Sequence, residues 1–240
     1  MLDISLSGDN YESSTRTFSD RSGLGNNGIS VNNALFSNGK YGSVDGAMNF
    51  NGASDVVKIS NIIVSNPNEL TISAWFKKES GGSTYECVLH QNSNYTIGAS
   101  AYWLGVDSTD YLTATIGANT GVGWVAGKTD IKAIYGEWYH LLATWDGSVV
   151  KVFVNGEYVK QYSLTSYTNQ TSPTRIGASA DSGTNYWFRG EIEGVKILNY
   201  SLSDEEVENL YMIEVVVIQV LSLGRMVPVK IVRAYLVKIY

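Results

Sequence analysis

Short runs of β-branched and aromatic residues, separated by Gly, Asn and Ser, dominate most of the chain. The runs lie at residues 70–76, 85–89, 111–116, 138–145, 149–154, 157–162, 174–176 and 194–198. From Leu70 to Phe76 every second position is apolar, which is the period of a strand with one buried face. Many short strands divided by turn residues indicate an all-β sandwich or barrel.

Two turn signals make residues 138–160 the clearest local unit. Asp146-Gly147 and Asn155-Gly156 are hairpin-turn pairs, because both central residues of a type I′ turn need positive φ. The interval between the pairs predicts a three-stranded meander.

A helical signal is confined to residues 201–211. Ser203 precedes Asp204 and two glutamates, which gives an N-cap, a reciprocal Glu206 and acids at the positive end of the helix dipole. One short helix, packed on the sandwich by its apolar residues, is expected here.

Residues 212–240 differ from the rest of the chain. They carry four basic residues and one acid, a net charge of +3, against −6 for the whole chain. Charged residues, Gln219 and Pro228 interrupt each 20-residue window, so a membrane-spanning helix is not expected. The Val- and Ile-rich segments 213–223 and 226–240 have high strand propensity. Three alternatives for the role of the extension stay open. The extension adds strands to a neighbouring subunit as a homo-oligomer interface, packs on its own domain, or is a non-native tail.

Composition narrows the classes of partner and compartment. A sequence pI near 4.9 argues against nucleic-acid binding, which needs clustered Lys and Arg. Cys87 is the single cysteine, so no intrachain disulfide forms. The first residues lack the basic start and apolar run of a signal peptide. An extracellular or virion-associated protein would then have lost a signal or left the cell by another route.

Several blocks along the chain match a known family in order. They lie at residues 20–28, 39–42, 47–52, 70–76, 138–156, 176–177, 188–197 and 202–206. Over about residues 1–211 the chain resembles laminin-G-like domains of the concanavalin A-like lectin and glucanase superfamily. The resemblance implies a jelly-roll sandwich of two antiparallel sheets whose first and last strands pair. Residues 212–240 are an extension of unknown role.

The resemblance also implies a calcium site. Such domains often bind Ca²⁺ through an early Asp-x-Ser-Gly loop and an acid on the closing strand. The matching positions are Asp20, backbone oxygens of Gly25 or Asn26, and Glu193. Hard Ca²⁺ takes oxygen ligands, whereas the alternative is that Asp20 simply caps its own Asx turn. The family more often has Asp where this chain has Glu193.

Carbohydrate binding uses aromatic faces for stacking, and loop acids for hydroxyl groups. Loop-side candidates are Tyr102, Trp103, Asp107, Asp110, Trp124 and Tyr186. The alternative is that the aromatic residues are ordinary sandwich core. Trp103 and Trp124 flank the acids Asp107 and Asp110 and a Gly-rich loop at 117–123, and loops at sheet ends are where recognition usually resides.

Catalysis is not expected. Glucanases of the superfamily carry E-x-D-x-x-E on one strand, and the nearest approach is Glu191-x-Glu193-x-x-Lys196. Acid and nucleophile must flank the scissile bond, so replacement of the third carboxylate by Lys196 argues against hydrolysis. His140 lies in a predicted strand and is expected to be structural.

Two hypotheses follow. The first is a non-catalytic, calcium-assisted carbohydrate-binding or adhesion module, on a virus particle or microbial surface, whose partner is a glycan or glycoprotein. The second is a structural or assembly protein that uses the sandwich as a scaffold and residues 212–240 as its subunit interface. The fold alone does not choose between them.

Overall fold

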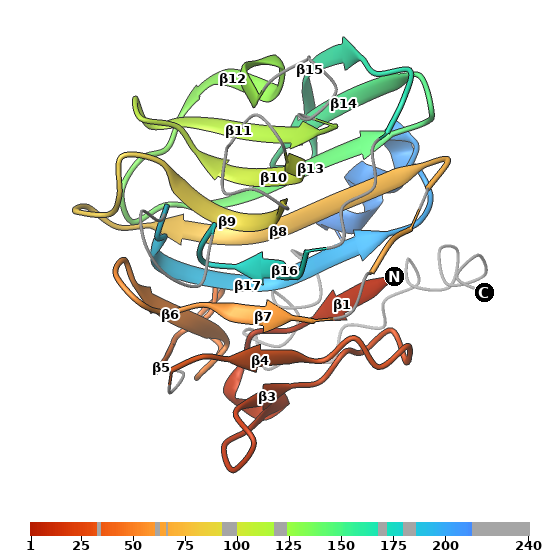
Figure 1. Ribbon diagram of the computed structural model, residues 1–240. Helices are drawn as coiled ribbons and strands as arrows, with labels where there is room; N and C mark the ends of the chain where they lie inside the picture. Colours follow the sequence, from red (N-terminus) through yellow and green to blue (C-terminus); the bar gives the residue numbers. More distant parts are fainter. Residues whose placement is uncertain are drawn as a thin grey trace, which may run out of the picture.

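Two antiparallel β-sheets stack face to face and enclose the core (Figure 1). The computed structural model describes residues 1–32, 35–60, 63–65, 67–92, 100–117, 124–167, 172–179 and 186–212. The predicted jelly-roll sandwich is confirmed. Apart from Met212, the extension at residues 212–240 lies outside the described residues.

The first sheet, called sheet A, has eight strands in the order β15-β14-β13-β8-β17-β6-β5, with β1 also paired to β17. Their bounds are β1 Leu2–Ile4, β5 Leu35–Ser37, β6 Ala47–Asn51, β8 Leu70–Lys78, β13 Trp138–Trp145, β14 Val149–Val154, β15 Glu157–Ser163 and β17 Arg189–Leu198. Leu2 lies opposite Ile197 and Ile4 opposite Val195, so the first and last strands pair as the resemblance implied.

The second sheet, called sheet B, has nine strands in the order β12-β11-β10-β9-β16-β7-β4-β3-β2. Their bounds are β2 Tyr11–Glu12, β3 Thr17–Phe18, β4 Gly28–Ser30, β7 Val57–Ile59, β9 Glu86–Asn92, β10 Ser100–Val106, β11 Tyr111–Ile116, β12 Lys128–Lys132 and β16 Thr174–Ile176. Two 3-10 turns, η1 Gly8–Asn10 and η4 Trp124–Gly127, complete the described elements together with a helix at residues 204–212.

Every predicted run coincides with a strand. The run at 70–76 lies within β8 and that at 194–198 within β17, whose first half was expected only from the family resemblance. Sequence reasoning missed β10, β12 and the strands before residue 60. Most of the early strands are only two or three residues long, so they carry no periodicity of their own.

The two predicted hairpin turns differ in geometry. Asn155 and Gly156 have φ of 52° and 82°, so both are left-handed, as a type I′ turn requires. In the turn before β14, Gly147 has positive φ but Asp146 does not. The Asp146 carboxylate instead accepts hydrogen bonds from the amides of Ser148 and Val149, and this Asx turn closes the hairpin.

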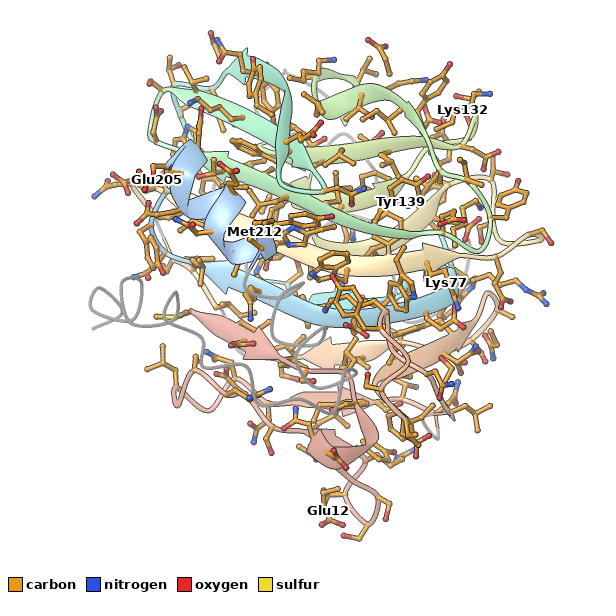
Figure 2. The ribbon with its side chains drawn as sticks, turned by 180° about the vertical axis from the view of Figure 1, so that it is seen from behind. Glu12, Lys77, Lys132, Tyr139, Glu205 and Met212 are labelled. Carbon is orange, nitrogen blue, oxygen red and sulfur yellow. The ribbon has the colours of Figure 1, made fainter. Side chains whose placement is uncertain are left out.

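The helix at residues 204–212 lies across the outer face of sheet A (Figure 2). Its start is the predicted capping box, because Ser203 N donates to Glu206 Oε2 at 2.9 Å and Glu206 N donates back to Ser203 Oγ at 3.3 Å. Beneath it, Val207 packs in a small second core with Leu142 and Phe153. The main core lies between the two sheets.

Candidate functional site

One end of the sandwich, at the left of Figure 1, brings together loops that belong to both sheets. These loops span residues 79–85, 107–110, 133–137 and 186–188, and are called the loop end below. Ala133 N donates to Asp110 O at 2.8 Å, and Gly136 N donates to Lys78 O at 2.9 Å. Backbone hydrogen bonds therefore hold the loops to one another, which limits their freedom before any ligand arrives.

A buried ion pair supports the loop end from beneath. Lys78 closes β8 and Glu86 opens β9, and their side chains form an ion pair at 4% and 1% residue exposure. The second carboxylate oxygen of Glu86 accepts a hydrogen bond from Arg189 N at 2.9 Å. Burial lowers the pKa of Lys78, and the charge of Asp110 opposes that shift. A charge pair in this position joins sheet A to sheet B.

Asp110 and Tyr135 form the exposed part of the same network. Asp110 Oδ1 lies 3.6 Å from Lys78 Nζ, and its side chain is 39% exposed. Tyr135 is 52% exposed, donates its hydroxyl to Asp110 Oδ2 at 3.2 Å, and has the Lys78 ammonium 5.3 Å from its ring centroid. The negative charge of Asp110 raises the pKa of the Tyr135 phenol, so this hydroxyl keeps its proton at neutral pH.

Asp110 adopts an uncommon backbone conformation. Its φ is 67°, in the left-handed region that Asp tolerates better than most residues. Asp110 N donates to Asp107 O at 3.0 Å, which holds the turn. Backbone strain of this kind tends to occur at functional sites, where neighbouring structure keeps it in place.

Asp107 secures the turn but is itself occupied. Its Oδ1 accepts hydrogen bonds from the amides of Thr109 and Tyr111, and its Oδ2 pairs with Lys128. Burial raises the pKa of Asp107, but the hydrogen bonds from Lys128, Tyr111 and Thr109 outweigh burial and lower it overall. Asp107 is buried, so its role at the loop end is to position Asp110.

Tyr186 reaches the same end of the sandwich. Its ring meets that of Tyr85 edge to face, with centroids 5.3 Å apart, and its carbonyl accepts from Cys87 N at 3.1 Å. Trp187 N donates to Ser83 Oγ at 3.0 Å. The rings of Tyr85, Tyr186 and Trp187 are each partly exposed, which adds aromatic surface beside the Asp110 network.

The structure therefore gathers three of the six predicted contact residues, Asp107, Asp110 and Tyr186, at one place. It also adds Lys78, Glu86 and Tyr135, which sequence reasoning missed. Tyr135 could have been found, because Tyr135-Gly136 lies in a loop between two predicted strands. Nothing in the sequence indicates that Lys78 lies next to Asp110.

The other three predicted contact residues lie elsewhere. Tyr102 faces the core, fully buried, and its hydroxyl bonds with Thr174 Oγ1 at 2.6 Å. Trp103, its neighbour, points to the outer face of sheet B and is 1% exposed. Trp124 begins η4, and its side chain lies outside the described part of the chain.

Trp103 belongs to a row of residues across sheet B. It lies opposite His90, which in turn lies opposite Arg175. His90 Nδ1 donates to Ser179 O at 3.1 Å, and burial together with Arg175 lowers the pKa of His90 to about 4. All three side chains of the row are buried, so it offers less accessible surface than the loop end.

The predicted calcium ligands are engaged with the protein itself. The Asp20 carboxylate accepts hydrogen bonds from the amides of Asp3, Ser22 and Asn26 and from the Ser22 hydroxyl. Burial raises the pKa of Asp20, and these hydrogen bonds more than compensate, so the pKa is lowered overall. This is the geometry of an Asx turn, the alternative raised from the sequence.

Glu193 is occupied by a cationic side chain. Its Oε1 forms an ion pair with the Lys40 ammonium, and its Oε2 accepts from Lys40 N at 3.0 Å. Among the described residues no group of three or more His, Cys, Asp or Glu side chains forms a metal cluster. Both carboxylates of the predicted ligand set are thus engaged with the protein, and the calcium site at Asp20, Gly25, Asn26 and Glu193 stays a prediction from the resemblance.

The acids of the closing strand each have a lysine partner. Glu191 pairs with Lys77 at 3.0 Å and Glu193 with Lys40, while Lys196 pairs with Asp3 at 3.1 Å. Glu193 and His140 flank Trp75 on the outer face of sheet A. There the Trp75 ring stacks on those of His140 and Tyr211, with centroids 4.9 and 5.5 Å apart.

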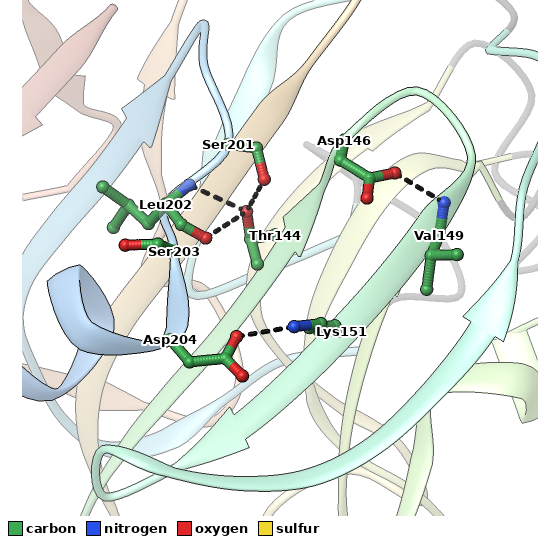
Figure 3. A pocket seen from close by; sticks show the side chains of 8 residues that line it. All are labelled: Thr144, Asp146, Val149, Lys151, Ser201, Leu202, Ser203 and Asp204. Carbon is green, nitrogen blue, oxygen red and sulfur yellow. Dashed lines mark hydrogen bonds and ion pairs between the residues drawn. The ribbon is translucent and has the colours of Figure 1, made fainter.

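Two grooves run beside the helix at residues 204–212. The first, about 390 Å³, is lined by the β13–β14 hairpin and residues 201–204, and Lys151 pairs there with Asp204 at 2.7 Å (Figure 3). Thr144 Oγ1 accepts from Leu202 N at 3.0 Å in the same wall. The second, about 550 Å³, is lined by the helix and residues 153–158. Hydrogen bonds within the first groove already use the polar groups of its wall.

In the described part of the chain, no helix has the length and apolar character needed to cross a membrane.

The two stacked antiparallel sheets and the paired terminal strands define a concanavalin A-like β-sandwich. The family model for the concanavalin A-like lectin/glucanases superfamily, of the laminin-G type, matches residues 51–208, and the chain belongs to this family. A comparison with curated protein sequences gives no match.

Solved structures share the fold at low identity. Domain 4 of AbnA, an extracellular GH43 arabinanase from Geobacillus stearothermophilus in complex with arabinotriose, is 19% identical with a TM-score of 0.64 over 88% of this chain and 97% of that one. The binding domain of Paraclostridial Mosquitocidal Protein 1 is 14% identical (TM-score 0.64), over 88% of this chain and 51% of that one. A Trypanosoma rangeli sialidase mutant displaying trans-sialidase activity is 16% identical (TM-score 0.63), over 88% and 32% respectively. The chain thus spans nearly all of the first structure but about half and a third of the others.

Proposed function

We propose that this chain is a non-catalytic carbohydrate-binding module that contacts extracellular glycans through its loop end. The observation that carries the proposal is the exposed Tyr135 ring beside the partly exposed Asp110 carboxylate, on a base fixed by Lys78 and Glu86. Sugar rings stack on aromatic faces, and carboxylates accept hydrogen bonds from sugar hydroxyl groups.

Two further features support this assignment. Ile134 is 63% exposed beside Tyr135, so it adds apolar surface next to the exposed tyrosine ring. The first-named structural neighbour is a domain in complex with arabinotriose, and the second is a toxin binding domain. Presentation on a microbial surface or virus particle, in an adhesion role, extends the proposal and rests on the sequence.

The lysine partners of Glu191 and Glu193 support the non-catalytic part of the proposal. A general acid and a nucleophile must each reach the scissile glycosidic bond, whereas the Glu191 and Glu193 carboxylates are held in ion pairs with Lys77 and Lys40. Hydrolysis of a bound glycan, followed by release of reducing ends, would contradict this part.

The experiment is a glycan array with the full chain, followed by titration calorimetry on the glycans that bind. Tyr135→Ala is expected to weaken binding at least tenfold, because stacking and the Asp110 hydrogen bond are both removed. Tyr158→Ala is the matched control, since Tyr158 is 49% exposed on β15 and lies outside the loop end. Absence of glycan binding by the unmodified chain, or equal affinities for Tyr135→Ala and the control, would refute the proposal.

A further inference from the structure

The charge of the Lys78, Glu86 and Asp110 network is unevenly distributed between its buried and exposed parts. Lys78 and Glu86 neutralise each other beneath the surface, where both are almost fully buried. Asp110 is the third member of this network and the most exposed one. The three groups together carry one net negative charge, and that charge is at the surface.

Asp110 has hydrogen-bonding capacity left for a ligand. An ionised carboxylate offers about four lone-pair sites. Tyr135 uses one at Oδ2, and the Lys78 ammonium lies at 3.6 Å from Oδ1, beyond a normal hydrogen bond. Two neighbouring hydroxyl groups could donate to the remaining sites, with the sugar face against Tyr135.

An anionic sugar would meet the opposite situation. Its carboxylate would approach Asp110 before Lys78, because Lys78 is 4% exposed and already paired with Glu86. Like charges about 4 Å apart at a protein surface repel each other, because the effective dielectric constant there is lower than that of water. Reorienting Lys78 toward the ligand would leave Glu86 buried without its partner, which is costly.

Resting on the proposed function, we infer that the loop end selects neutral glycans with adjacent free hydroxyl groups and discriminates against uronic and sialic acids. Asp110 is the specificity-determining residue. Its fixed φ of 67° and the hydrogen bond from Ala133 N to its carbonyl keep the carboxylate in place before binding.

The test compares neutral oligosaccharides with uronic acids that differ only in a carboxylate at C6, such as galactose and galacturonic acid trimers, on an array and by calorimetry. The unmodified chain is expected to bind the neutral member at least tenfold more tightly at low salt. The ratio of the two affinities should shrink at 0.5 M NaCl, because the Debye length there is only about a few ångströms.

Asp110→Asn is expected to weaken binding of the neutral sugar about tenfold and to narrow the neutral-to-acidic ratio. Asp130→Asn, an exposed aspartate on β12, is the matched control and should change neither value. Equal or tighter binding of the acidic sugars, or a ratio that Asp110→Asn leaves unchanged, would overturn the inference while the proposed function stands. Binding of no glycan at all would overturn both.

Discussion

The loop end and the face beneath the helix use similar residues in opposite ways. Both combine aromatic rings with a lysine and a carboxylate: Tyr135 with Lys78 and Asp110 in one, Trp75 with Lys40 and Glu193 in the other. Trp75 is 3% exposed, whereas Tyr135 is 52% exposed. Residue type alone therefore does not distinguish a binding surface from a packed cluster, because accessibility decides which groups a ligand can reach.

Substituting Trp75 and Tyr135 in turn is the strongest test of this difference between a packed cluster and an exposed one. Trp75→Ala is expected to destabilise the fold by about 3–5 kcal/mol, since it removes a buried indole that stacks on the rings of both His140 and Tyr211. Tyr135→Ala should leave the unfolding midpoint unchanged and affect binding alone. Urea denaturation of both variants, with calorimetry on the folded protein, separates the two roles. Similar losses of stability in both variants would show that Tyr135, like Trp75, has a role in stabilising the fold.

Substitution of Lys78 tests whether the loop end depends on the buried ion pair between Lys78 and Glu86. Lys78→Met should cost about 3 kcal/mol, because Glu86 would stay buried with an uncompensated charge. The double variant Lys78→Met with Glu86→Leu should regain most of that stability, as replacing both partners removes the buried charge. Lys132→Met, an exposed lysine on β12, is the control. A fully stable Lys78→Met protein would mean that the pair contributes no structural constraint.

Acid should weaken the fold through its two buried histidines. Burial lowers the pKa of His140 to about 3 and that of His90 to about 4, against an ordinary value near 6.5. Between pH 6.5 and about 4 the unfolded chain binds protons that the folded chain does not. The contribution of the two histidines to the free energy of unfolding is therefore fully present above pH 6.5. On acidification it falls by about 1.4 kcal/mol per pH unit for each histidine.

The variant His140→Phe tests the contribution of His140 to this acid sensitivity. Its stability difference between pH 7 and pH 5, from urea denaturation, should be smaller than that of the unmodified chain by about 2 kcal/mol. The described residues of the loop end include no histidine, so glycan affinity of the folded protein should stay nearly constant over the same range. An identical pH dependence in His140→Phe would exclude His140 as a source of the acid sensitivity.

Calcium has the smallest expected effect. The hydrogen bonds to Asp20 and the ion pair of Glu193 already engage both carboxylates, so we expect that millimolar Ca²⁺ does not raise the melting temperature. A site filled at a hundred times its Kd would add about 2.7 kcal/mol, which differential scanning fluorimetry detects readily. A rise of that size, lost in Asp20→Asn, would instead establish the calcium site that the resemblance implies.

Much of the sandwich could be predicted because its signals are local. Alternation from Leu70 to Phe76, the Asn155-Gly156 turn and the Ser203 capping box each depend on neighbours within a few residues. The candidate site is different. Asp110 was identified because acids in loops are common ligands, but its partners Lys78 and Tyr135 are 32 and 25 residues away in sequence. Tyr102 and Trp103 show the limit most clearly, because adjacent strand residues point to opposite faces, and only sheet stacking decides which face is the core.

The sequence by itself determined about half of the strands, the helix and the family of this protein, since periodicity, turn chemistry and capping are properties of contiguous residues. The tertiary structure decided which of the aromatic and acidic residues are accessible. Burial and charge pairing arise when segments far apart in the chain meet: Lys78 meets Asp110 at the loop end, and Lys40 neutralises Glu193 on sheet A. Those contacts turned one set of predicted ligands into a packed, ion-paired surface and left Asp110 and Tyr135 exposed at the loop end.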